Sequence, residues 1–222
     1  MKKFTILDGA AIAVWLLPLG YLLYIYPSLP QTVPMHYSLN GTIDRYGSKA
    51  EFMTIQWIML GVPILVYLLL KFLPAIDPKK QVKYGETTFM KLALGIVIFF
   101  SALNIAIMFA TLHHGLKIDK LIFPLIGLLF AFLGNVMNSI KPNYFAGIRT
   151  PWTLESEDNW RATHRLAGRI WFAGGILLTI LMLILPQEPA TIIFMCSIGI
   201  LAFVPIIYSY VYFKKHQLDQ NS

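Results

Sequence analysis

Six long stretches without a charged residue constrain this chain more than any other feature of its sequence. They contain no Asp, Glu, Lys or Arg and are 18 to 25 residues long. By number they are 9–26, 52–70, 92–112, 121–140, 170–187 and 189–213. An α-helix rises about 1.5 Å per residue, so about 20 apolar residues cross the ~30 Å hydrocarbon core of a bilayer. We therefore predict an all-α membrane protein, a bundle of six transmembrane helices.

The composition agrees with this prediction. Hydrophobic residues make up 57% of the chain and charged residues only 13%, whereas soluble domains carry about 25% charged residues. The segments between the stretches are short, the longest being 141–169, which excludes a large extramembrane domain. We expect one integral membrane domain over residues 1–222. The single cysteine, Cys196, excludes an intramolecular disulfide.

The distribution of cations predicts the orientation. With the N-terminus in the cytoplasm, 14 of the 18 Lys and Arg residues fall on the inner side, as the positive-inside rule requires. We expect both termini and segment 141–169 to be cytoplasmic and segment 27–51 to be external. The net charge of +7 then reflects topology and contact with anionic lipid headgroups. Nucleic-acid binding is not expected, because no basic patch with interleaved aromatic residues is visible.

The six stretches lack the groups that a coupled ion pump needs. All five His residues lie outside them, and proton or ion relays require ionisable groups within the membrane. No internal repeat indicates an inverted-repeat transporter. Asn135 and Asn138 are polar residues at membrane depth, three positions apart and so on one helix face. Such side chains often hydrogen-bond between helices.

The external segment 27–51 predicts a β-hairpin. Asn40-Gly41 between β-prone flanks is typical of a type I′ turn, which needs positive φ at both central residues. That turn pairs His36 with Arg45 and Tyr37 with Asp44, and places His36 and Asp44 on opposite faces. Metal ligands must converge on one point, so we expect no metal site. We expect a small rigid cap that recognises a ligand through His36, Asn40, Gly41, Asp44, Tyr46 and Lys49.

Two helix starts carry the capping-box pattern. In Thr5-Ile6-Leu7-Asp8 and in Ser48-Lys49-Ala50-Glu51, a hydroxyl residue is followed three positions later by an acidic one. We expect these side chains to satisfy the backbone N–H groups that the first helical turn leaves without partners.

The internal segment 141–169 predicts an amphipathic helix that continues into the fifth stretch. Thr153 fits an N-cap, and the acidic residues that follow it suit the positive end of the helix dipole. Arg161, Arg165 and Arg169 recur every four residues and form a cationic stripe, beside a face that carries Trp160 and His164. Two interpretations remain open: anchoring at the lipid interface, or a surface for protein docking.

The internal segment and its flanks carry a set of distinctive residues: Gly134-Asn135, Lys141-Pro142-Asn143-Tyr144-Phe145, the run 147–154, Trp160, His164-Arg165 and Gly168. This set resembles the signature of the SdpI family, bacterial membrane proteins named for immunity to a secreted killing peptide. The amino-terminal part is similar to a companion bacterial domain of unknown function. That similarity rests on Leu29-Pro30, the run 33–36, Asn40-Gly41, Asp44, the run 47–49, the run 76–80 and Tyr84.

The resemblance implies a membrane immunity or signalling protein in the bacterial cell membrane. A secreted antibacterial peptide would be met outside, and a cytoplasmic transcriptional repressor would be held or released inside. This coupling requires two arrangements of the bundle whose balance the outer ligand shifts. The implied partner-binding residues are Asn135, Asn138, Asn143, Arg149, Thr150, Trp152, Trp160, His164 and Arg165.

An enzyme and a transporter accessory or lipid-binding subunit are the alternatives to this expectation. A membrane metal-dependent hydrolase would use His36 with Asp44, or His164 with Glu157, but catalysis needs a converging nucleophile, base and stabilising group, and no such spacing is present. We therefore expect neither an enzyme nor a cofactor. A transporter accessory or lipid-binding subunit is the remaining alternative, which the cationic stripe would suit.

Overall fold

The computed structural model describes residues 4–38, 42–76, 85–113 and 116–220. Its long helices are α1 (Ile6–Ile25), α2 (Lys49–Ile76), α3 (Glu86–Leu112), α4 (Asp119–Met137), α6 (Glu157–Ile184) and α7 (Gln187–Gln220). Shorter elements are the 3-10 turn η1 (Tyr26–Ser28), strands β1 (Thr32–Tyr37) and β2 (Ile43–Ser48), and helix α5 (Pro151–Glu155). The six long helices are apolar enough to cross a membrane. The predicted six-helix fold is confirmed.

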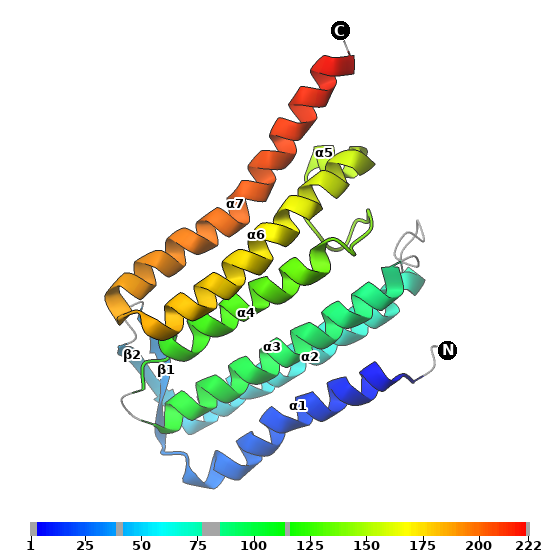
Figure 1. Ribbon diagram of the computed structural model, residues 1–222. Helices are drawn as coiled ribbons and strands as arrows, with labels where there is room; N and C mark the ends of the chain where they lie inside the picture. The colour runs from blue at the N-terminus through cyan, green and yellow to red at the C-terminus, as the bar shows by residue number, and fades with distance from the viewer. Residues whose placement is uncertain (1–3, 39–41, 77–84, 114–115, 221–222) are drawn as a thin grey trace.

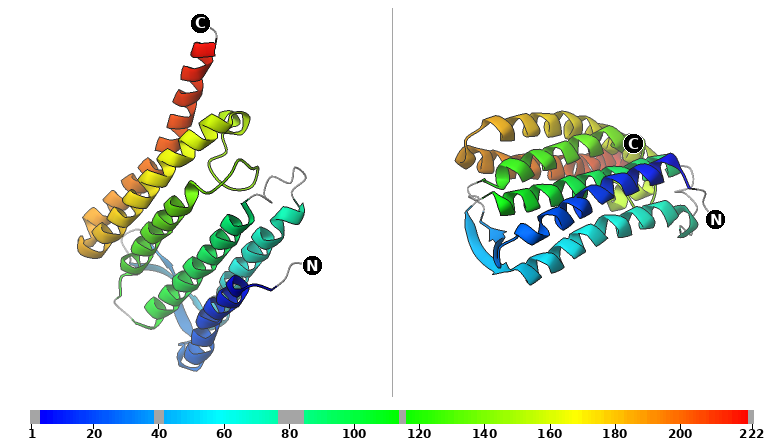
Figure 2. Two further views of the ribbon diagram at one scale, coloured as in Figure 1. Left: turned by 45° about the vertical axis from the view of Figure 1, so that its right-hand side comes forward. Right: turned by 90° about the horizontal axis from the view of Figure 1, so that it is seen from below.

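The helices form a bundle with two halves (Figure 1). Helices α1, α2 and α3 pack together, as do α4, α6 and α7, and the halves meet mainly along α3 and α4. The β1–β2 hairpin lies at one end of the bundle, and α5 and both chain termini lie towards the other. Figure 2 shows that the C-terminal part of α7 extends beyond the other helices. The connection between α4 and α6 is therefore separated from the hairpin by the length of the bundle.

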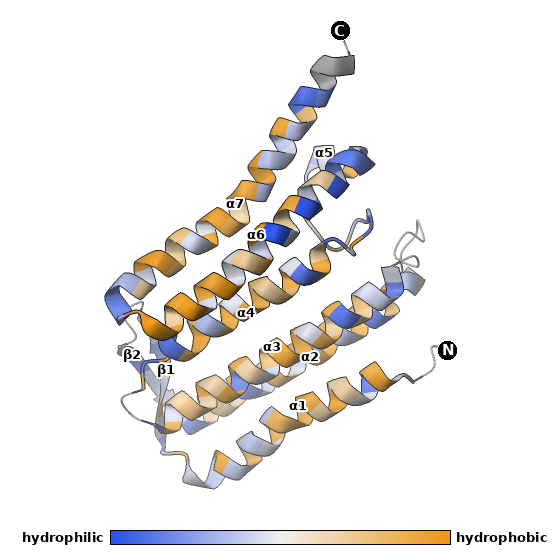
Figure 3. Ribbon diagram, in the orientation of Figure 1, coloured by the Kyte–Doolittle hydropathy of each residue, from blue (hydrophilic) through white to orange (hydrophobic). Residues whose placement is uncertain are grey.

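The surface of the bundle is apolar along its middle. Figure 3 shows hydrophobic residues over the central turns and hydrophilic residues gathered near the ends. Large side chains such as Leu65, Leu183 and Ile192 are exposed, whereas the polar Ser101 and Asn104 are buried. This is the distribution expected of helices in lipid, where exposed apolar side chains carry no penalty and polar groups turn inward.

Small residues bring α4 and α6 into backbone contact. Gly127 and Gly134 on α4 are seven residues apart, two helical turns, and so lie on one face. A Cβ atom at Gly134 would overlap the backbone nitrogen of Phe172, and one at Gly127 would lie 2.8 Å from the backbone nitrogen of Thr179. Gly175 on α6 faces the backbone of α4 in the same way. Such close approach is the usual source of helix association in membranes, where apolar burial contributes little.

The capping box predicted at Thr5 is confirmed. The Asp8 amide donates to the Thr5 hydroxyl at 3.4 Å, and the Thr5 amide donates to the Asp8 carboxylate at 2.7 Å. The same carboxylate accepts hydrogen bonds from Tyr67 at 2.8 Å and from Lys71 at 2.6 Å. Asp8 therefore joins the start of α1 to α2 as well as capping its own helix.

The box predicted at Ser48 is half formed. The Glu51 amide donates to the Ser48 hydroxyl at 3.1 Å, but the Glu51 carboxylate forms an ion pair with Arg45 at 2.7 Å. The charge of Arg45 attracts this carboxylate to strand β2, so the acidic residue fixes the hairpin to the start of α2.

Replacing Gly134 with alanine tests the contact between α4 and α6. We expect G134A to lower the free energy of unfolding by about 1–3 kcal/mol, because the added methyl group overlaps the backbone of α6. The measurement is thermal unfolding of the purified chain in detergent. The control is G199A on α7, where nothing lies within 4 Å of an added Cβ atom. Equal stability of the two variants would contradict the proposed backbone contact.

Candidate functional site

The external segment forms the predicted hairpin, with a changed register. Strands β1 and β2 are antiparallel, and His36 pairs with Arg45 as predicted. Tyr37 pairs with Ile43 and not with Asp44, because the register shifts on both sides of His36. The predicted Asn40-Gly41 turn lies outside the described residues. The regular alternation assumed for the strands is therefore interrupted by bulges, which sequence patterns do not reveal.

The prediction that His36 and Asp44 point to opposite faces is wrong. Nδ1 of His36 lies 2.6 Å from Oδ1 of Asp44, with both side chains largely exposed. The shift leaves Asp44 without a cross-strand partner and turns its carboxylate towards His36. Within the described ranges, no group of three His, Cys, Asp or Glu residues is placed to hold a metal ion. The pair is a polar contact on the hairpin surface.

Lys49 and Tyr46 occupy different positions in the hairpin region. Nζ of Lys49 lies 4.1 Å from the centre of the Tyr26 ring and donates to the Leu29 carbonyl at 3.4 Å. Lys49 thus fastens the end of α1 to the start of α2. Tyr46 is exposed on β2 and is free to contact a ligand, whereas Asn40 and Gly41 lie outside the described residues.

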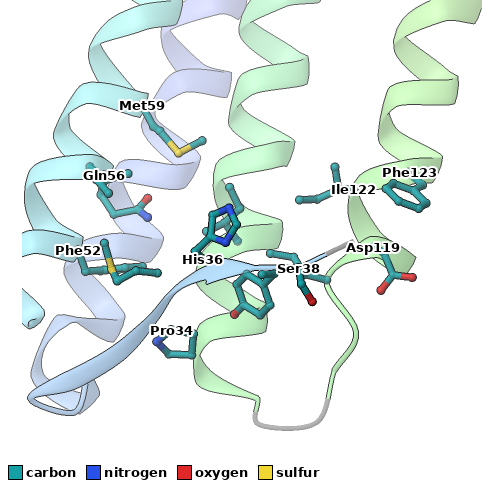
Figure 4. Close-up of a pocket in the computed structure, with 14 residues that line it drawn as sticks. Pro34, His36, Ser38, Phe52, Gln56, Met59, Asp119, Ile122 and Phe123 are labelled. Atoms are coloured by element: carbon teal, nitrogen blue, oxygen red, sulfur yellow. The ribbon is translucent and has the colours of Figure 1, made fainter. Parts of the chain in front are cut away.

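A cavity of about 340 Å³ lies beneath the hairpin. It is lined by β1, α2, α3 and α4, so both halves of the bundle contribute to it. Figure 4 shows Gln56 on α2 at one side, Asp119 at the start of α4 at the other, and His36 between them. Most other lining residues are apolar, among them Phe52, Ile122 and Phe123, which lie on α2 and α4. The cavity lies between the hairpin and the seam where the halves meet.

Sequence reasoning missed Gln56 and Asp119. Gln56 lies inside an uncharged stretch, where it did not interrupt the pattern, and Asp119 was counted only as a charge between two stretches. The signal that could have identified Gln56 is its position as a polar residue within the apolar stretch 52–70. Polar groups at membrane depth are costly and often functional. Their convergence on one cavity depends on how the two halves pack, which no local pattern encodes.

Tyr37 connects the hairpin to the wall of the cavity. Its hydroxyl shares a hydrogen bond with Thr111 on α3, and burial raises the pKa of Tyr37 above its usual value. The phenol therefore stays neutral and contributes no charge to the cavity.

The internal connection that follows α4, residues 138–150, is held in shape by side-chain hydrogen bonds, and we call it the braced loop. The Asn143 side chain accepts from the amides of Phe145 at 2.7 Å and Ala146 at 2.8 Å. Its Nδ2 donates to the carbonyls of Lys141 at 2.8 Å and Ala146 at 3.1 Å. Every hydrogen-bonding position of this buried side chain is thereby used. Asn143 shapes the loop and is not available to a partner in this arrangement.

His164 and Trp160 hold the loop against α6. The Ile148 amide donates to Nε2 of His164 at 3.2 Å, and Nδ1 lies 2.8 Å from the Trp160 carbonyl. An N–H donor at Nε2 requires a neutral imidazole with its proton on Nδ1. The Trp160 indole donates to the Ile140 carbonyl at 2.9 Å and stacks on His164 with ring centres 4.1 Å apart. Trp160 is 1% exposed and His164 is 2% exposed.

Gly147 is required where the loop passes these rings. Its φ is +110°, a conformation that side chains with a Cβ atom rarely adopt. A Cβ atom there would also overlap Nε2 of His164. The glycine of the motif thus permits the amide of the next residue, Ile148, to reach the imidazole.

Helix starts in the internal segment differ from the prediction. Thr153 was expected to cap a single helix, but Thr150 caps the short α5 and Ser156 caps α6. Thr153 is instead the third residue of α5, and its hydroxyl donates to the Ile148 carbonyl at 2.9 Å. Two caps in seven residues break the helix, because each hydroxyl satisfies the amides of its own first turn.

Three residues tie the internal segment to the last helix. The Trp152 indole donates to the Ser209 hydroxyl at 2.6 Å, and the Asn159 amide group donates to the Ser209 carbonyl at 3.0 Å. Thr150 also lies 3.4 Å from the Ser209 hydroxyl. Ser209 of α7 is fully buried by these contacts.

The nine predicted partner-binding residues divide by exposure. Asn135, Asn138, Arg149 and Arg165 are exposed, and Thr150 and Trp152 are half-buried. The buried members are Asn143, Trp160 and His164. The stripe of Arg161, Arg165 and Arg169 is exposed on α6, whereas the face of the same helix that carries Trp160 and His164 is buried. The predicted set thus includes three buried residues that hold the loop and four exposed residues that can contact a partner.

Six apolar helices with an ordered hairpin at one end and a braced loop at the other define a multi-pass membrane protein. Residues 139–209 match the SdpI/YfhL protein family. Residues 13–60 match a domain of unknown function, DUF1648. The resemblances predicted from the two loops are confirmed, and the family match covers the braced loop, α6 and most of α7.

Curated relatives extend the similarity along the chain. The protein called Immunity protein SdpI from Bacillus subtilis (strain 168) is 24% identical over 192 residues, which cover 86% of this chain and 88% of that protein. An uncharacterized protein from Archaeoglobus fulgidus is 34% identical over 71 residues, 32% of this chain and 37% of that protein. No solved structure matches the chain. The chain is a multi-pass bacterial membrane protein similar to SdpI over most of its length.

Replacing His164 with alanine tests the brace. The change leaves the buried Ile148 amide without an acceptor, which costs about 1–3 kcal/mol, and about 1.4 kcal/mol corresponds to a tenfold change in an equilibrium. We expect trypsin to cleave after Arg149 about tenfold faster in H164A than in the unchanged chain, measured on purified protein. The control is H216A, whose ring is exposed on α7. Unchanged cleavage in H164A would refute the bracing role.

Proposed function

We propose that this chain is an immunity-type membrane protein that protects a bacterium against a secreted antibacterial peptide. The observation that supports this proposal is the similarity to Immunity protein SdpI, which covers 86% of this chain and 88% of that protein. Because the similarity includes both the hairpin region and the braced loop, it extends over most of the chain and is not limited to one shared motif. The family segment at 139–209 supports the same function.

The proposed orientation places the hairpin outside the cell. The hairpin lies at one end of the bundle, and α5 and both termini lie towards the other. Fourteen of the 18 Lys and Arg residues belong to the terminal segments and to residues 71–91 and 141–169. The positive-inside rule assigns that cation-rich end to the cytoplasm. A peptide arriving from outside then meets the hairpin first.

In this proposal the hairpin and the cavity beneath it receive the peptide. The exposed His36, Asp44 and Tyr46 offer contacts at the surface. Asn40 and Gly41, which lie outside the described residues, remain predicted members of the same binding set. Lys49 acts by fixing the hairpin to α1 and α2 through its contacts with Tyr26 and Leu29. Rigid placement of recognition residues lowers the entropy that binding must overcome.

A cytoplasmic transcriptional repressor is the proposed inner partner. The observation that favours a docking surface is a loop held rigid by Asn143, Trp160 and His164 while Tyr144, Phe145 and Arg149 remain exposed. A connector without such a role has no need of exposed aromatic residues on an ordered frame. We infer that the buried residues of the predicted set shape this surface and that the exposed ones, including Arg165, contact the partner.

A physical route couples the two ends. A peptide in the cavity touches α2 and α3 in one half and α4 in the other, so it favours one arrangement of the halves if it fits that arrangement better. Helix α4 carries any displacement to the braced loop at its far end, because α4 and α6 move as one body through their backbone contact. The seam between α3 and α4 is the proposed bistable element.

Anionic lipid headgroups are a further proposed partner. Arg161, Arg165 and Arg169 are exposed in the first turns of α6, where the bundle meets the cytoplasmic interface in the proposed orientation. Arg161 also forms an ion pair with Glu157 at 2.5 Å. This stripe favours headgroup contact and supports the alternative of a lipid-binding or transporter-accessory subunit. The role we propose is non-enzymatic, as the name of the Bacillus subtilis relative suggests.

Expression in a peptide-sensitive bacterium tests the function. We expect the full chain to raise survival at least tenfold against one member of a panel of secreted killing peptides, relative to cells that produce an unrelated membrane protein in equal amount. In the native host, the double variant R149Q/R165Q should keep survival and lose the peptide response of a reporter fused to the chain's own promoter. The matched control for that variant is R161Q.

Two results would contradict these proposals. No gain of survival against any peptide, with the chain present in the membrane, would overturn the immunity function. If survival and reporter response in R149Q/R165Q fall only in proportion to the amount of protein, the docking role fails.

A further inference from the structure

The cavity beneath the hairpin contains two buried polar side chains without partners. Asp119 is 6% exposed and Gln56 is 1% exposed, and both line the cavity. Among the described residues, no group donates to either Asp119 oxygen, and neither polar atom of Gln56 forms a hydrogen bond. Buried polar groups are nearly always hydrogen-bonded, so an unpartnered set in one cavity calls for a ligand that supplies the missing bonds.

We propose that this cavity binds a cationic group, a Lys or Arg side chain or an amino terminus, carried on an apolar peptide segment. Asp119 is the counter-ion and the Gln56 side-chain oxygen is a second acceptor. The assignment of that segment to a secreted antibacterial peptide rests on the proposed function. The binding chemistry itself rests on the cavity.

The charge of Asp119 selects a cation. A buried carboxylate that accepts no hydrogen bond is unfavourable unless an opposite charge approaches it. The position of Asp119 in the first turn of α4 lets the helix dipole compensate its charge in part. The neighbouring cation Lys120 does not do so, because its Nζ donates to the carbonyls of Met182 and Leu185 on the other side. The site for a cation is therefore open.

Gln56 faces the site from the other half of the bundle. It lies on α2 and points towards His36, with Asp119 across the cavity (Figure 4). Its carbonyl oxygen accepts from an ammonium or guanidinium group, and its amide nitrogen can donate to a peptide carbonyl. A ligand that satisfies both residues connects α2 to α4.

The remaining wall sets the kind of molecule that carries the cation. Phe52, Ile55, Met59, Ile107 and Ile122 give the cavity an apolar lining. A volume of about 340 Å³ is at the lower limit of ligand pockets and suits one or two side chains. A metal ion is disfavoured because Ca²⁺ and Mg²⁺ need about six oxygen ligands. An apolar peptide segment with one cation fits both the lining and the charge.

The mouth of the cavity lies at the hairpin. His36 lines the cavity and is also exposed, where it meets Asp44 at 2.6 Å. Asp44 at the mouth already has His36 as a partner, whereas Asp119 inside has none among the described residues. Asp119 therefore attracts a cation into the cavity and repels an anionic segment.

Peptide binding to the full chain in a neutral detergent tests the proposal. The probes are acetyl-Leu-Lys-Leu-amide and acetyl-Leu-norleucine-Leu-amide, which differ in the ammonium group alone. We expect the lysine peptide to bind at least tenfold more tightly. D119N should bind the two peptides equally, and Q56L should reduce lysine-peptide affinity several-fold. The matched control D158N, also in the first turn of a helix, should keep the preference.

Folding of D119N is part of the same test. Removing an unpartnered buried charge relieves a cost, so we expect its unfolding temperature to equal or exceed that of the unchanged chain. Loss of lysine preference in a stable D119N supports the proposal. Equal binding of the two peptides by the unchanged chain, no binding of either, or a lysine preference that survives in D119N would each overturn it.

Failure of this inference is distinguishable from failure of the proposed function. A chain that protects cells but shows no lysine preference overturns the cation site and leaves the immunity function standing. A chain that prefers the lysine peptide through Asp119 but protects against no killing peptide overturns the immunity function and supports the cation site.

Discussion

The backbone contact between α4 and α6 fixes the position of everything at the cation-rich end of the molecule. Gly127, Gly134 and Gly175 leave no room for a side chain between the two helices, so their ends are held at a constant separation. The residues between the end of α4 and the start of α6 must connect these two points. They do so through Asn143, which uses all its hydrogen-bonding positions, and through His164, which receives the Ile148 amide. Close packing of small residues therefore sets the separation that the loop between α4 and α6 must span.

The other half of the molecule is built differently. Helix α1 is joined to α2 by a polar cluster around Asp8, in which Tyr67 and Lys71 donate to its carboxylate. The hairpin is fastened by Lys49 and by the ion pair between Arg45 and Glu51. The two halves share a seam at α3 and α4, and the cavity with Gln56 and Asp119 lies where that seam reaches the hairpin. A ligand there touches both halves, whereas the glycine contact keeps α4 and α6 together.

The spans were predictable because their cause is local: about 20 apolar residues suffice to cross a bilayer, and each stretch shows this by itself. Capping at Thr5 and the pairing of His36 with Arg45 were equally local and were confirmed. The bulge that brings His36 and Asp44 together was not predictable, since it depends on how the hairpin meets the bundle. Sequence also identified the motif residues Trp160 and His164 without showing that they are buried, and it missed the cavity, whose walls come from separate elements.

The central claim is that the hairpin with its cavity faces the outside and the braced loop faces the cytoplasm. Labelling of single cysteines with a membrane-impermeant maleimide on intact cells measures this most directly. In a C196S background, cysteine replaces Thr42 on the hairpin or Glu155 at the end of α5, both exposed. The account predicts labelling of T42C in intact cells and of E155C only after the membrane is made permeable. Labelling of E155C in intact cells, with T42C protected, would contradict it.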